Sequence, residues 1–223
     1  MTEPHAKEYG VLRERVEEVV RKSDASALER PVPATPEWTG LHLLSHMVGV
    51  TTDVVNGVLE GIATDPWTAA QVDARRGRSA TELLDEWAAS SPAFEVLLAG
   101  APEEIAGQAL FDAFTHEQDL RHSLGMPGGR DSAAKVLSWD WIVGARTRMG
   151  GTAIHCVTEA GEVVAGAGQP RATVRASRFE LLRATSGRRS AAEIRAYEWE
   201  PAPDPDLLLA ASIFTMRATP LAE

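Results

Sequence analysis

A carboxylate and an imidazole lie one helical turn apart near the middle of the chain. Asp112 and His116 are four residues apart in a segment whose apolar residues recur at helical spacing. Side chains at this spacing share one face of a helix, so the pair can chelate a metal ion. A third ligand must come from another helix, and His46, which has apolar neighbours, is the candidate. Two imidazoles and one carboxylate suit zinc or a similar first-row ion and leave positions open for water or substrate.

Other interpretations of these residues stay open. Each histidine can instead be a hydrogen-bonded core or surface residue, because a single Asp-x-x-x-His pattern is weakly specific. His42 lies four residues before His46 and is a rival or auxiliary ligand. Asp119 and Arg121 follow His116 closely, either as groups that support the metal ligands or as a solvated pair, and the solvated pair is preferred.

A helical bundle is predicted to carry these residues. Apolar periodicity and capping residues predict helices over about 8–22, 40–60, 80–98, 102–124 and 132–149, the last capped by Asp131. The proline-containing segments 24–36 and 66–78 are predicted to be connecting loops. Four helices joined by loops form a bundle, and metal sites in bundles use side chains from facing helices.

The pattern changes to short alternating segments after Gly151. It predicts strands over 152–159, 162–165 and 171–176, a helix around 179–182, a segment over 194–199 and a last apolar helix over 206–214. Such a mixture is typical of a small α+β unit. The expected fold class is therefore α+β, with a helical bundle at 1–150 and a small α+β domain at 151–223.

Composition and charge exclude several classes of function. The chain has 32 acidic residues against 22 lysines and arginines, a formal net charge of −10, which opposes the phosphate backbone of nucleic acids. It contains no apolar run long enough to span a membrane and no secretory signal at its start, so a cytoplasmic location is expected. The single cysteine, Cys156, lies in an apolar alternating segment, where a buried structural side chain is expected.

Two motifs resemble those of the DinB-like, mycothiol-dependent maleylpyruvate isomerase family. The segment from Trp38 to Gly49, WTGLHLLSHMVG, resembles the family helix in which a tryptophan precedes the first metal histidine by eight residues. The segment from Phe111 to Gly125, FDAFTHEQDLRHSLG, resembles the second motif, with an acidic residue, a histidine and an aspartate–leucine pair. The segment from Ala167 to Ser190 resembles the second domain of the family, which is similar to sterol-carrier proteins.

The resemblance implies site residues and also shows two departures. It implies metal ligands at His46, Asp112 and His116, and a catalytic arginine at Arg188, with Arg189 as the next candidate. An arginine can hold a substrate carboxylate with two parallel hydrogen bonds. The family usually has glutamate where this chain has Asp112, and aspartate where it has His42.

The implied function is that of a metal-dependent thiol transferase or isomerase. A divalent metal, with zinc preferred, and a mycothiol-like thiol are the expected cofactors, and a small electrophilic acid is the expected substrate. A non-catalytic small-molecule-binding or sensing module that keeps the bundle is the alternative, motivated by the two departures. A structural dimerisation protein is a third reading, suggested by the six tryptophans and an apolar C-terminal helix.

Overall fold

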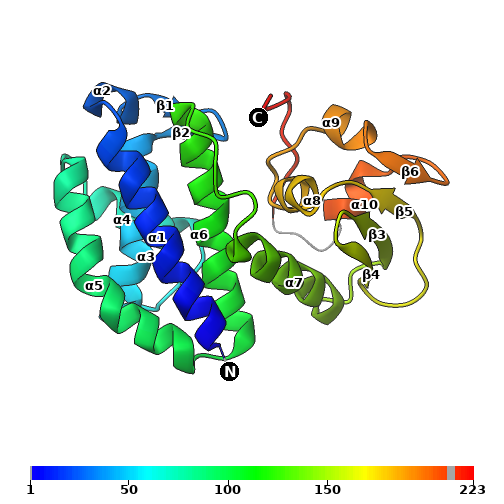
Figure 1. Ribbon diagram of the computed structural model, residues 1–223, viewed down its shortest axis with the longest axis horizontal. Coiled ribbons are helices and arrows are strands. Elements are labelled where there is room, and N and C mark those ends of the chain that lie inside the picture. The colour runs from blue at the N-terminus through cyan, green and yellow to red at the C-terminus, as the bar shows by residue number, and fades with distance from the viewer. Residues whose placement is uncertain (1, 210–213) are drawn as a thin grey trace. The chain divides into compact units, whose positions relative to one another are not determined.

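The computed structural model describes residues 2–209 and 214–223. The chain divides into two compact units, Met1–Gly129 and Arg130–Glu223. Helices form the first unit, whereas the second combines a small sheet with helices (Figure 1). The predicted α+β class with an N-terminal helical bundle is therefore confirmed.

Four long helices form the bundle of the first unit. They are α1 (Glu3–Lys22), α3 (Gly40–Val55), α5 (Ala80–Gly100) and α6 (Glu103–Leu124). Helices α1 and α3 both pack against α5 and against α6 (Figure 1). Capping boxes at Thr39 and Ser79 start α3 and α5, in agreement with the helix starts predicted there. Helix α3 ends at Val55, earlier than predicted, because the chain turns at Gly57 with a positive φ of 71°.

Two segments predicted to be loops contain further elements. The segment 24–36 holds α2 (Ala25–Leu28), β1 (Pro31–Val32) and the start of β2 (Thr35–Thr39), which pairs antiparallel with β1. The loop predicted over 66–78 is wrong for most of its length, because α4 (Asp65–Ala74) lies there. Its proline is in the first turn of the helix, where the missing N–H has no intrahelical partner to lose.

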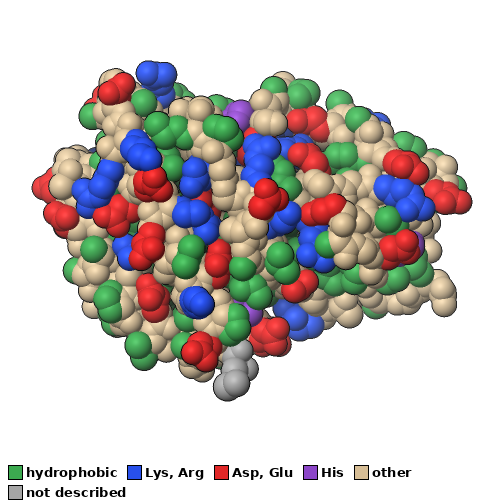
Figure 2. Space-filling view, viewed as in Figure 1, with side chains coloured by type: hydrophobic (Ala, Val, Ile, Leu, Met, Phe, Trp, Pro, Cys, Tyr) green, Lys and Arg blue, Asp and Glu red, His purple; other side chains and the backbone are tan. Residues whose placement is uncertain are grey.

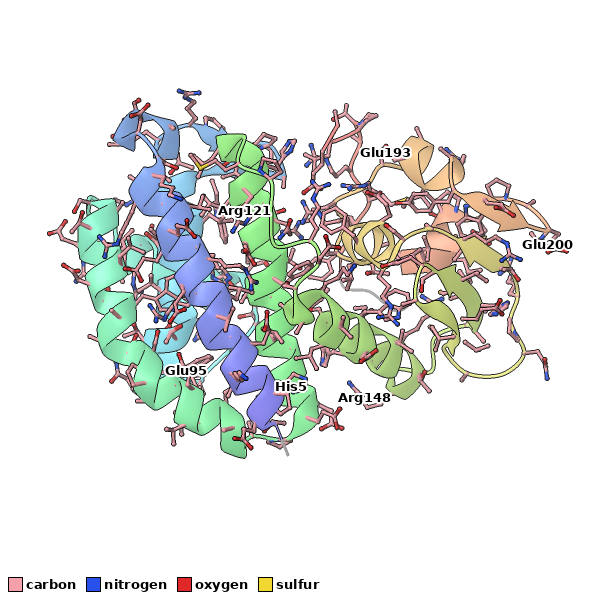
Figure 3. All side chains as sticks on the ribbon, viewed as in Figure 1. His5, Glu95, Arg121, Arg148, Glu193 and Glu200 are labelled. Atoms are coloured by element: carbon pink, nitrogen blue, oxygen red, sulfur yellow. The ribbon has the colours of Figure 1, made fainter. Side chains whose placement is uncertain are left out.

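A fully buried carboxylate joins α1 to α6. Glu117 on α6 accepts hydrogen bonds of 2.9 and 2.8 Å from the Nε and Nη2 atoms of Arg15 on α1. It also accepts one of 2.9 Å from Nε of Arg121, one turn further along α6 (Figure 3). Burial of a charge is costly unless oppositely charged donors compensate it, and here two guanidinium groups do so. These hydrogen bonds hold α6 against α1 at Glu117, which directly follows the candidate metal ligand His116.

Replacing Glu117 with glutamine is expected to lower the free energy of unfolding by about 3 kcal/mol, because two partly buried arginines lose their counter-charge. Urea denaturation followed by circular dichroism measures the change. The control is Glu18→Gln on α1, whose carboxylate and partner Lys22 are both exposed. Equal losses in the two variants would contradict a special role for the buried carboxylate.

The second unit contains a four-stranded mixed sheet in the order β4-β3-β5-β6. Strand β3 (Ile154–Thr158) is antiparallel to β4 (Gly161–Ala165) and parallel to β5 (Thr173–Arg175), and β6 (Glu198–Glu200) is antiparallel to β5. The three strands predicted from the alternating pattern are thus present. Cys156 in β3 is buried, and burial raises the pKa of its thiol to about 12, which suits the expected structural role.

Helices complete the second unit. They are α7 (Ala133–Arg148), α8 (Arg178–Thr185), α9 (Ala191–Arg195) and α10 (Pro205–Leu209). Ser132, rather than the predicted Asp131, is the N-cap residue of α7. The segment predicted over 194–199 is shared between the end of α9 and β6. The helix predicted over 206–214 is described as far as Leu209, and residues 210–213 of that prediction lie outside the described residues.

Helix α7 belongs to the second unit, because it packs against β4 and α8. The contact division therefore falls between Gly129 and Arg130. The domain boundary at residue 150 stays a prediction.

The surface of the first unit is mixed in charge. Acidic and basic side chains alternate over its visible face (Figure 2). Across the described residues, no helix has the length and apolar character needed to cross a bilayer.

Candidate metal centre

Three potential metal ligands predicted from the sequence converge inside the first unit. His46 lies on α3, and Asp112 and His116 lie one turn apart on α6. One ligand atom from each lies within 4.8 Å of the other two. The Nε2 atoms of His46 and His116 are each 3.5 Å from an Asp112 carboxylate oxygen, Oδ2 and Oδ1 respectively. The carboxylate is therefore adjacent to both imidazoles, as ligands of a single divalent ion are.

The start of α3 sets the positions of His46 and His42. The capping box at Thr39 sets the start of α3, and His46 follows two turns later on the buried side of the helix. His42 completes that box, because its Nδ1 accepts a hydrogen bond from the Thr39 amide. This contact gives His42 a structural role, and the metal-binding cluster found among the described residues contains His46 but not His42.

An oxygen atom lies near the other ring nitrogen of each histidine, as a hydrogen-bond partner of His46 and as an ion-pair contact of His116. Nδ1 of His46 is 2.8 Å from Oε1 of Gln71, and Nδ1 of His116 is 3.3 Å from Oδ2 of Asp119. Histidines that bind metals commonly donate the second ring N–H to such an oxygen, which fixes the tautomer. When Nδ1 carries the proton, Nε2 presents a lone pair toward Asp112. The lone pairs of Nε2 and of the carboxylate oxygen then repel each other, and a metal ion or a proton between them relieves that repulsion.

Charge interactions within the cluster shift two pKa values. Partial desolvation raises the pKa of Asp112, but the adjacent His116 and His46 outweigh it and hold the pKa of that carboxyl well below its ordinary value. Burial lowers the pKa of His116, but Asp112 and Asp119 outweigh it and raise the pKa. In the absence of metal, the centre therefore retains a proton on His116 to higher pH than an ordinary histidine would.

The exposure of the three side chains is unequal. The His46 and His116 side chains are 6% and 9% exposed, whereas that of Asp112 is 39% exposed. Solvent therefore reaches the cluster on the Asp112 side. The indole ring of Trp38, at the end of β2, lies 5.3 Å from the His46 ring and 6.1 Å from the His116 ring, between ring centroids. It forms an apolar wall beside both histidines.

Two residues next to the cluster differ from what the sequence suggested. Asp119 is fully buried and faces His116, so its interpretation as half of a solvated pair with Arg121 is wrong. Gln71 was not identified, because it lies on α4, where a loop was predicted. The signal that could have found it is the start of α4, with Thr64 at the N-cap position, a proline in the first turn and Trp67 four residues before Gln71.

The two candidate arginines lie in the second unit. Arg188 is 8% exposed, and its Nη1 donates to the carbonyl oxygen of Ser186 at 2.6 Å. Arg189 forms ion pairs with Glu180 and Glu223 at 2.7 and 2.9 Å, which gives it a structural function. Arg188 is the better candidate for substrate binding, and its catalytic role stays a prediction.

Comparison with known proteins shows similarity to one family. The sequence model of the mycothiol maleylpyruvate isomerase N-terminal domain matches residues 9–121, which cover half of the chain and include His46, Asp112 and His116. No curated protein matches the chain by sequence.

Solved structures add a likeness of fold. The crystal structure of the mycothiol-dependent maleylpyruvate isomerase is similar with a TM-score of 0.65 and 12% sequence identity, over 92% of this chain and 96% of that one. A histidine-to-alanine mutant of that enzyme is similar with a TM-score of 0.64 at the same identity and coverage. At this identity the structural likeness concerns the fold.

Proposed function

Because this chain belongs to the mycothiol maleylpyruvate isomerase family, we propose that it is a metal-dependent enzyme acting on a small electrophilic acid with a low-molecular-weight, mycothiol-like thiol. The product is either a thiol conjugate or a cis–trans isomer of the acid. The observation that carries the proposal is the convergence of His46, Asp112 and His116, with the His46 imidazole hydrogen-bonded to Gln71 and the His116 imidazole beside Asp119.

The donor set fits a divalent metal, and zinc is the preferred ion. Two imidazole nitrogens and one carboxylate oxygen are a known protein ligand set for zinc centres that keep a position open. Asp112 is one methylene shorter than the glutamate usual in the family, but its carboxylate already reaches both Nε2 atoms at 3.5 Å. The shorter side chain is therefore compatible with a shared ion.

The chain's own residues would orient and shield the reactants. A bound divalent metal lowers the pKa of a coordinated thiol, so that the thiolate nucleophile exists at neutral pH. The partly exposed Asp112 side leaves an approach for the thiol. Trp38 limits the access of water on the side of the two histidines, which strengthens electrostatic interactions within the site.

Arg188 would bind the carboxylate of the acidic substrate. Arg188→Lys is expected to lower kcat/KM for the acid by at least about tenfold, because lysine keeps the charge but loses the planar two-donor fork. Steady-state kinetics with varied acid at saturating thiol measure the effect. Arg195→Lys, at an exposed arginine of α9, is the matched control. Identical kinetics for Arg188→Lys and the wild type would remove Arg188 from the mechanism.

The test of the proposal starts with metal content. Mass spectrometry of protein purified without an affinity tag should find near-stoichiometric metal, and the His46→Ala and Asp112→Ala variants should lose it. The loaded wild type is then assayed with mycothiol and electrophilic unsaturated acids. Wild type that holds no metal, even after reconstitution, would refute the proposal and favour the non-catalytic binding module.

A further inference from the structure

We propose that Gln71 is a positioning residue for the metal centre: its amide oxygen holds His46 in the tautomer whose Nε2 can bind metal, and Asp53 fixes the direction of that amide. The inference rests on the proposed metal-dependent function, because it assigns a task to a residue outside both sequence motifs. Gln71 lies on α4 and is 1% exposed, so its side chain faces the protein rather than solvent.

The direction of the Gln71 amide follows from Asp53 on α3. One end of the amide lies 3.0 Å from Oδ2 of Asp53, and the other lies 2.8 Å from Nδ1 of His46. An ionised carboxylate only accepts hydrogen bonds, so the NH₂ group of Gln71 must face Asp53. The amide oxygen then faces His46, and Nδ1 of His46 must be the donor. The proton on Nδ1 leaves the Nε2 lone pair directed at Asp112.

Gly49 of α3 leaves space for the Gln71 side chain. A Cβ atom at Gly49 would lie 2.5 Å from Cβ and 2.7 Å from Cγ of Gln71, which is closer than two carbon atoms can approach. Glycine at this position therefore lets α4 lie against α3, one turn beyond His46. At the C-terminal end of α4, Nη1 of Arg75 donates to the Gln71 carbonyl oxygen at 3.0 Å and so closes the last turn of that helix.

The second histidine has an equivalent partner of different charge. Asp119 occupies the corresponding place beside Nδ1 of His116, at 3.3 Å. A neutral amide therefore hydrogen-bonds one imidazole, whereas a carboxylate makes an ion-pair contact with the other. Loss of such outer partners commonly costs a metal site about 10- to 100-fold in affinity.

The first experiment reads the tautomer in metal-free protein. Long-range ¹H–¹⁵N NMR spectra of histidine rings, recorded where the imidazoles are neutral, distinguish Nδ1–H from Nε2–H. We expect His46 in the Nδ1–H form in the wild type and a shift toward Nε2–H in Gln71→Leu. In the double variant Gln71→Glu with Asp53→Asn, position 53 becomes the donor and position 71 the acceptor of the hydrogen bond between them. An oxygen of residue 71 still faces His46, so the double variant should restore the Nδ1–H form.

The second experiment measures zinc affinity by competition with a chelator. Gln71→Leu is expected to weaken zinc binding about 10- to 100-fold, with recovery in the double variant. Gln108→Leu, at an exposed glutamine of α6, controls for the substitution type and should not change the affinity. Gly49→Ala should weaken zinc binding in the same direction as Gln71→Leu, because it displaces the Gln71 side chain.

The two experiments separate failure of the inference from failure of the proposed function. Tight zinc binding in the wild type, with tautomer and affinity both unchanged in Gln71→Leu, would overturn the role of Gln71 alone. Absence of zinc binding in the wild type would overturn the proposed function and the positioning role together. Loss of affinity in Gln71→Leu without recovery in the double variant would show that Gln71 acts by packing, which also overturns the inference.

Discussion

His116→Ala is expected to weaken zinc binding by more than about 100-fold while the bundle stays folded. An outer partner of a metal ligand is commonly worth 10- to 100-fold in affinity, so direct loss of one of three protein ligands should cost more. The remaining pair, His46 and Asp112, comes from two different helices and cannot chelate the ion from one helical turn. Isothermal titration calorimetry against a zinc–chelator buffer measures the affinity, and circular dichroism measures retention of the fold.

The matched control is His122→Ala, further along the same helix. His122 lies in the last turn of α6 and is not part of the cluster. We expect its affinity for zinc to equal that of the wild type. A His116→Ala variant that keeps wild-type affinity would show that zinc binds through other residues.

Helical periodicity was enough to predict that His46, Asp112 and His116 lie close together. The four-residue spacing of Asp112 and His116 fixes their common face once α6 exists, and the apolar stripe of α3 turns His46 toward the core. Both helices have strong capping or termination signals, such as the capping box at Thr39 and the left-handed Gly125. These are local properties, so the sequence alone was sufficient to predict them.

The surroundings of the cluster could not be predicted in the same way. Helix α4 is short, and its single proline resembled a loop signal, so Gln71 had no predicted place beside His46. The burial of Asp119 depends on which side of α6 the neighbouring helices cover, which is a property of tertiary packing. Spacing therefore identified the candidate ligands, whereas the residues that orient them required the structure.

Zinc affinity is expected to fall with decreasing pH, beginning above the ordinary histidine pKa of about 6.5. Burial opposes the shift, but Asp112 and Asp119 raise the pKa of His116, so the metal-free centre carries a proton that zinc must displace. Below the raised pKa, release of this one proton costs about tenfold in affinity per pH unit, and above it the affinity levels off. Zinc titrations at several pH values, corrected for buffer binding, measure this dependence.

The metal-free protein should respond to pH in the opposite direction. Because the folded-state pKa of His116 is raised, protonation stabilises the metal-free fold fully below the unfolded pKa, and this stabilisation is lost as pH rises through the folded pKa.

The Asp119→Asn variant removes one of the charges that raise the pKa of His116, so the midpoint of the zinc-affinity profile should move to lower pH. A zinc affinity that is independent of pH through this range would show that zinc does not displace a proton from His116. His116 would then be a histidine that pairs with two carboxylates for structural reasons. Zinc binding would have to use other ligands than the imidazole on which the proposed ligand set depends.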